Sequence, residues 1–126
     1  MLQNSAIYAY IPVKDLGRAR KFYEEKLGFS NGQERAGGVH FSCANGTAFF
    51  MYVSDSAGTN KASQAFWTVT DLRAEMKELR ARGVVFEEYD TPDFKTVDAI
   101  ATGGGAMSAW FKDPDGNILA IVQTIS

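Results

Sequence analysis

The chain contains one cysteine, one histidine and three prolines in 126 residues, and it has no marked excess of either charge. A disulfide needs two thiols, so Cys43 cannot form one within the chain, and its place in an apolar stretch favours a buried thiol over a nucleophile. Thirteen basic and fifteen acidic residues give a net charge of −2. Because no lysine or arginine cluster forms a phosphate-binding stripe, we expect no nucleic-acid partner.

Long hydrophobic runs are also missing. No apolar segment approaches the ~20 residues that a membrane helix needs, and the first residues lack the basic and apolar regions of a signal peptide. We therefore expect no membrane association and a cytoplasmic protein. The 45% hydrophobic and 13% aromatic content is typical of a folded globular chain. At this length one domain buries a sufficient core without disulfides.

A repeat organises the chain. Val13-Lys14-Asp15-Leu16 begins a helix-like segment, and Val69-Thr70-Asp71-Leu72 begins another 56 residues later. Each start follows an apolar run, and each helix precedes strand-like stretches and a hairpin turn. This order predicts an α+β fold with two βαβββ units, at about residues 4–54 and 62–125 of a single domain. Units this small must pack together to bury their sheets.

The ends of both helices carry local signals. Asp15 and Asp71 are residue types that cap a helix N-terminus, and Gly28 and Gly83 are suited to the left-handed conformation that ends one. Helices are therefore expected at about 16–27 and from Leu72 to the stop at Gly83. The expected strands after the helices are 29–35, 39–43, 47–53, 84–89, 106–112 and 117–124.

The second unit is longer than the first. Its hairpin glycine, Gly116, lies 70 residues after the matching Gly46, whereas the helix starts differ by 56. The 14 additional residues fall between Asp90 and Gly105 and include the loop 91–105. Long glycine-rich insertions are often lids or ligand loops, and a plain surface excursion is the alternative interpretation.

Two motifs resemble a known family. They are the helix end Phe22-Tyr23 to Leu27-Gly28-Phe29 and the hairpin Asp113-Pro114-Asp115-Gly116-Asn117. With the repeat, they resemble the vicinal oxygen chelate superfamily, which includes glyoxalase I, bleomycin-resistance proteins and extradiol dioxygenases. The resemblance implies that the units form a curved mixed sheet around a cup and that the chain forms a homodimer. It is nearly silent on the substrate.

In metal-dependent members of that superfamily, the first and last strands of each unit supply ligands that are typically His, Gln or Glu. The repeat places these positions at Tyr8, Phe50, Gln64 and Ala120. A catalytic divalent ion needs about three nitrogen, oxygen or thiolate ligands, and among these four only Gln64 is a plausible ligand. We therefore expect no metal site and no cofactor.

Aromatic residues occupy many of the same inward positions. Strand alternation puts Tyr8 and Tyr10 on one face of a strand, and the same holds for Phe50 and Tyr52. Such rings suit a flat or amphipathic ligand, although some of them are equally well explained as core. Alternation from Gln64 favours Phe66 over Trp67 as the inward residue. The candidate ligand-binding residues are Tyr8, Tyr10, His40, Phe50, Tyr52, Gln64, Trp67 and Trp110.

His40 is the candidate catalytic residue, because it alone has an unperturbed pKa near neutrality. A structural strand histidine is the competing interpretation. The leading hypothesis is a metal-free protein that binds an aromatic or amphipathic small molecule in an aromatic-lined cup. The alternative is a metal-dependent or His-assisted lyase, isomerase or dioxygenase of the same superfamily. A domain that binds a protein partner is the third hypothesis.

Overall fold

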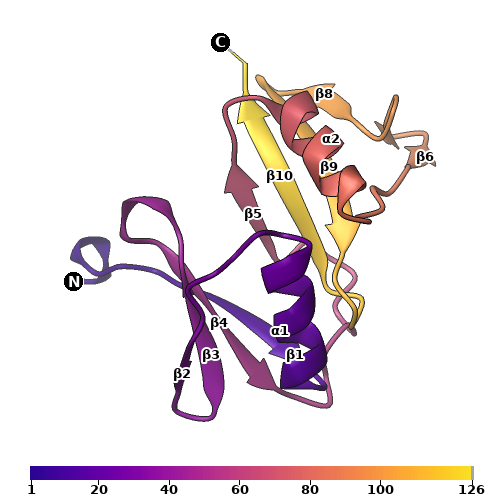
Figure 1. Cartoon of the computed structure of the whole chain (residues 1–126). Coiled ribbons are helices and arrows are strands. Elements are labelled where there is room, and N and C mark those ends of the chain that lie inside the picture. Colours follow the sequence, from indigo (N-terminus) through magenta and orange to yellow (C-terminus); the bar gives the residue numbers. More distant parts are fainter. Residues whose placement is uncertain (126) are drawn as a thin grey trace.

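Each half of the chain builds one four-stranded mixed sheet with a helix beside it (Figure 1). The computed structural model describes residues 1–125. The strand orders are β1-β4-β3-β2 and β5-β10-β9-β8. In the two sheets, β1 is parallel to β4 and β5 is parallel to β10. All other neighbouring strands are antiparallel. The predicted α+β class and its repeated topology are confirmed.

The elements follow the predicted order, with a short additional hairpin in the second half. They are η1 Leu2–Asn4, β1 Ala9–Val13, α1 Leu16–Glu25, β2 Gln33–Arg35, β3 Gly38–Ser42, η2 Ala44–Gly46, β4 Ala48–Val53, β5 Ala65–Thr68, α2 Leu72–Ala81, β6 Asp90–Thr91, β7 Phe94–Lys95, β8 Ala101–Gly103, β9 Ala106–Lys112 and β10 Ile118–Thr124. Neither α1 nor α2, nor any other helix in residues 1–125, is long and apolar enough to cross a membrane.

Both helices begin where the local signals predict, and a glycine follows each of them. The Asp15 carboxylate accepts a hydrogen bond from the backbone N–H of Arg18, and Asp71 accepts one from that of Ala74. These bonds satisfy amide groups that have no partner inside the helix. Glycines with positive φ follow the two helices, at +84° and +95°. The predicted helices are confirmed, with α1 ending about two residues earlier than expected.

The predicted strand 84–89 is wrong in its extent. Phe86 forms only an isolated bridge with Phe111, and the backbone N–H of Glu87 donates to the carbonyl of Trp110 at 2.8 Å. The start of β9 is instead paired with β8, which comes from the 14 additional residues. The insertion thus divides the edge strand into two segments that pair with different ends of β9.

One hydrophobic core serves both halves. The sheet faces on the helix side contribute Ile11, Val13, Val39, Phe41, Met51, Ala109, Phe111, Leu119 and Ile121, and the helices contribute Ala19, Tyr23, Leu72, Met76 and Leu79. All of these residues are buried. The helix-side faces of the two sheets therefore pack around a common core, and the opposite faces point away from it.

The Asp113–Asn117 hairpin joins the second half to the first. The Tyr23 hydroxyl donates to Oδ2 of Asp113 at 2.8 Å. The Asn117 amide donates to the carbonyl of Pro12 at 2.7 Å and accepts from the backbone N–H of Gly58 at 3.1 Å. Asp113 and Asn117 are both buried. The motif that carried the family resemblance is therefore a structural link between the halves.

Candidate ligand-binding face

Strand alternation divides the side chains of the first sheet between its two faces. Ile11 and Met51 are at most 1% exposed and belong to the core. Tyr10, next to Ile11, points to the opposite face and is 69% exposed. The register places Tyr10 opposite Phe50, and Phe50 opposite His40 on its other side. The pleat therefore aligns these three rings across β1, β4 and β3.

Five of the eight predicted site residues lie on this side of the first sheet, which we call the aromatic face. Tyr8 and His40 pack edge to face with ring centroids 5.7 Å apart. Tyr10 makes similar contacts with Phe50 at 6.0 Å and with Tyr52 at 5.0 Å. Edge-to-face pairs are favourable because the edge of an aromatic ring carries partial positive charge and its face carries partial negative charge. The result is an ordered surface that combines apolar rings with phenol and imidazole groups.

Gly38 allows the Phe50 ring to lie across β3. A Cβ at Gly38 would lie 2.5 Å from Cζ of Phe50 and 2.1 Å from the carbonyl oxygen of Met51. Both distances are too short for a real side chain, so any larger residue would displace the ring or the strand. The strands expected at 29–35 and 39–43 leave this glycine in the segment between them. Its spacing from His40 was the signal that it belongs to the same face.

Two predicted site residues carry a buried polar atom with no hydrogen-bond partner. Within residues 1–125 these atoms are Nδ1 of His40 and Oε1 of Gln64. Buried polar atoms are usually paired, and an unpaired one costs folding free energy. Gln64 lines a groove of about 570 Å³ together with Tyr8, Trp67 and the exposed ring of Phe66. This groove brings Tyr8, Gln64 and Trp67 together at one edge of the aromatic face.

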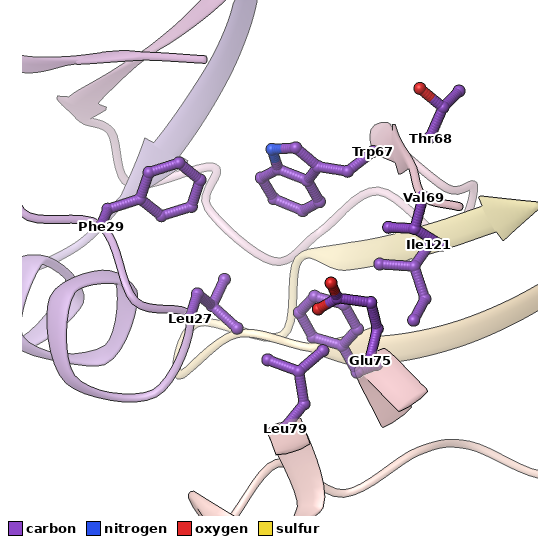
Figure 2. A pocket seen from close by; sticks show the side chains of 9 residues that line it. Leu27, Phe29, Trp67, Thr68, Val69, Glu75, Leu79 and Ile121 are labelled. Atoms are coloured by element: carbon purple, nitrogen blue, oxygen red, sulfur yellow. The ribbon is translucent and has the colours of Figure 1, made fainter. Parts of the chain in front are cut away.

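Trp67 lines that groove but lies apart from the aromatic face. It lies on the helix side of the second sheet, and its ring faces Phe29 (Figure 2). The ring centroid of Trp67 is 6.0 Å from that of Phe29, 5.8 Å from that of Phe49 and 6.4 Å from that of Phe111. Its neighbour Phe66 points the other way and is 61% exposed. The alternation counted from Gln64 is therefore confirmed.

Trp110 is also separate from the aromatic face. It lies on the side of the second sheet away from α2, where Tyr89 and Phe94 contact its ring at 5.8 and 5.1 Å. Phe94 belongs to the β6–β7 hairpin of the insertion, so the insertion covers this sheet face around Trp110. Burial raises the pKa of the Tyr89 phenol, and the nearby Glu87 charge adds to the rise. The sequence interpretation missed Tyr89 and Phe94 because nothing local links them to Trp110.

The residues at the family's metal-ligand positions do not fit a catalytic divalent ion. Tyr8, Phe50, Gln64 and Ala120 present a phenol, a phenyl ring, a carboxamide and a methyl group, which is too poor a donor set. Within residues 1–125, no group of three or more His, Cys, Asp and Glu side chains is placed to hold an ion.

Residues 6–121 match the family model of the Glyoxalase/Bleomycin resistance protein/Dioxygenase superfamily. The chain belongs to this superfamily, and the predicted resemblance is confirmed.

Solved structures share the fold. TnmS3, an antibiotic binding protein from Streptomyces sp. CB03234, is 22% identical over 98% of each chain, with a TM-score of 0.68. A putative glyoxalase family protein from Bacillus anthracis is 17% identical over 96% of this chain and 95% of its own, with a TM-score of 0.73. A glyoxalase/bleomycin resistance protein from Streptomyces sp. CB03234 is 22% identical over 93% and 98%, with a TM-score of 0.65. No curated protein matches the sequence significantly.

Proposed function

We propose that the protein binds a small aromatic or amphipathic molecule on the aromatic face without the help of a metal ion. The observation that carries this proposal is the exposure of clustered rings: Tyr10 is 69% and Tyr8 51% exposed, although both belong to an ordered set of ring contacts. Contiguous exposed apolar surface on a folded protein usually marks an interaction site. The antibiotic-binding TnmS3, which has the same fold, supports a small molecule as the ligand class.

The chemistry of the face suits such a ligand. Phe50 and the tyrosine rings offer flat apolar surface, and the phenols of Tyr8, Tyr10 and Tyr52 can donate and accept hydrogen bonds at its margin. His40 adds an imidazole ring to the same face, in contact with Tyr8. A planar ligand with polar edges would bury the rings and pair with these groups. The donor set at the family's metal-ligand positions supports binding without a metal.

We also propose that the protein forms a homodimer, in which a second copy encloses the aromatic face. Within residues 1–125, β1 pairs only with β4, and β5 pairs only with β10, so β1 and β5 are open edges of their sheets. Each of these strands carries an exposed aromatic residue, Tyr10 in β1 and Phe66 in β5. Open edges and exposed rings are commonly covered by self-association. Light scattering at micromolar concentration should give twice the chain mass. A monomer mass would contradict this proposal and leave an open binding face.

The binding proposal is tested by calorimetric titration with a panel of planar aromatic compounds, including antibiotics. At least one compound should bind, and Tyr10→Ala should weaken its binding about tenfold or more, because one large aromatic contact is worth roughly 1.4 kcal/mol or more. Val85→Ala is the matched control, since Val85 is similarly exposed but lies outside the face. Absence of binding across the panel, or equal binding by both variants, would contradict the proposal.

A further inference from the structure

A second pocket lies on the helix side of the molecule, between the two halves (Figure 2). Its volume is about 220 Å³, and no residue of the aromatic face lines it. Leu27 and Phe29, which follow α1, form one wall. Trp67 and Phe111 from the second sheet form another, and α2 closes a side with Leu79. This pocket is smaller than the ~300–1,000 Å³ typical of drug-sized sites, so it fits only a small molecule.

Aromatic rings give this pocket its character. The Trp67 and Phe111 rings lie nearly parallel, at 13° with centroids 6.4 Å apart, and Phe29 lies 6.0 Å from Trp67 at a tilt of 42°. Ring faces carry partial negative charge, so a cation close to them is attracted, most strongly by tryptophan. The walls therefore favour a ligand with an apolar body and a positive group.

Among residues 1–125, Glu75 is the only charged residue that lines the pocket. Its side chain extends from α2, and its carboxylate is turned toward the space among the apolar side chains (Figure 2). No lysine, arginine or histidine nitrogen of residues 1–125 lies within salt-bridge distance of it. One helical turn away, by contrast, Glu78 pairs with Arg82 at 3.6 Å. The Glu75 charge is thus free to pair with a ligand.

We propose that this pocket binds a small organic ammonium ion with an aromatic or aliphatic body. The ammonium group lies between the Glu75 carboxylate and the Trp67 ring, and the body packs on Phe29, Leu27 and Leu79. Because Leu27 and Phe29 come from the first half and the remaining walls from the second, the bound cation bridges the two halves. This site is independent of the proposed function, which uses the opposite face of the first sheet.

The test uses 2-phenylethylamine, which is a cation at neutral pH, and 2-phenylethanol, which has the same carbon skeleton without the charge. The titrated protein carries Trp110→Phe, so Trp67 is its only tryptophan and its fluorescence reports on the pocket. The amine should change this fluorescence saturably, and the alcohol should bind at least about fivefold more weakly, as expected for one partly exposed ion pair with a cation–π contact.

Glu75→Gln should weaken amine binding about fivefold and leave alcohol binding unchanged, since it removes the charge and keeps the shape. Glu78→Gln is the matched control: it makes the same change on the same helix outside the pocket, and it should bind the amine normally. Tyr10→Ala should also bind it normally, which separates this site from the aromatic face. The proposal is overturned if the amine gives no saturable signal, if amine and alcohol bind equally, or if the two glutamate variants lose the same affinity.

Discussion

The two halves of the molecule have the same strand order but cover the outer faces of their sheets differently. On the first sheet, Tyr8 and Tyr10 stay open to solvent. On the second, Phe94 of the insertion and the preceding Tyr89 pack against Trp110. The same architecture therefore carries one accessible aromatic surface on the first sheet, whereas on the second sheet the chain covers Trp110 and leaves Phe66 exposed. The 14 additional residues therefore make the outer faces of the two sheets different around Trp110.

The hairpins differ in a second way. Cys43 and Asp113 stand at the same distance before the turn glycines of their halves, 70 residues apart. Asp113 is only 5% exposed and accepts hydrogen bonds from Tyr23 and Asn117. Cys43 is a half-buried thiol whose pKa is raised by burial and lowered in part by the nearby Trp67. Only the second hairpin thus links the halves through a buried polar network.

The largest expected effect is on this network. Asp113→Ala removes the acceptor of the Tyr23 hydroxyl, of the Asn117 amide and of two backbone N–H groups. Leaving buried donors unpaired should lower the free energy of unfolding by about 3 kcal/mol or more, measured by urea denaturation. Cys43→Ala, the equivalent change in the first hairpin, should cost about 1 kcal/mol. Equal costs would show that the hairpins do not differ in this role.

A smaller effect is expected in the insertion. Phe94→Ala should uncover Trp110, increase the quenching of tryptophan fluorescence by acrylamide and destabilise the protein by about 1–2 kcal/mol, because Phe94 is only partly buried. Val97→Ala is the control, since Val97 lies in the same insertion and is 74% exposed. Unchanged quenching in Phe94→Ala would mean that the insertion does not cover the second sheet.

The smallest effect concerns pH. Burial raises the pKa of Asp113. Hydrogen bonds from Asn117 and Tyr23 lower the pKa, but their effect is smaller than that of burial. A carboxyl with a raised pKa in the folded state favours folding when protonated. This contribution is therefore fully present below the ordinary value of 3.8 and is lost as pH rises through the folded pKa.

Urea denaturation of the wild type and Asp113→Asn between pH 3 and 7 measures this contribution. The stability advantage of the wild type over the variant should shrink as pH rises, because only the wild type has the titrating group. An advantage that grows with pH would mean that hydrogen bonding to the ionised carboxylate outweighs its burial.

Much of the architecture was predictable from short-range signals. The caps at Asp15 and Asp71 and the alternation along β1 and β4 depend on neighbouring residues only. Therefore the helix starts and the order of elements along the chain follow from local geometry and the repeat, as do the shared faces of Tyr8 with Tyr10 and of Phe50 with Tyr52. The alternation also separated Phe66 from Trp67.

Long-range packing decided the rest. Residues 84–89 have the pattern of a strand, yet only Phe86 forms a bridge with β9, and β8 pairs with the start of β9 instead. Which segment pairs with the start of β9 depends on how the insertion folds. Likewise, the contact of Phe94 with Trp110 and the pocket beside Glu75 depend on how two distant segments pack. The sequence by itself determined the two repeated units and their inward-facing positions. These follow from the backbone dihedral preferences of the residues and from the spacing of the apolar residues along each helix and strand. Only the tertiary structure decided which sheet face stays open, since packing between distant residues sets it.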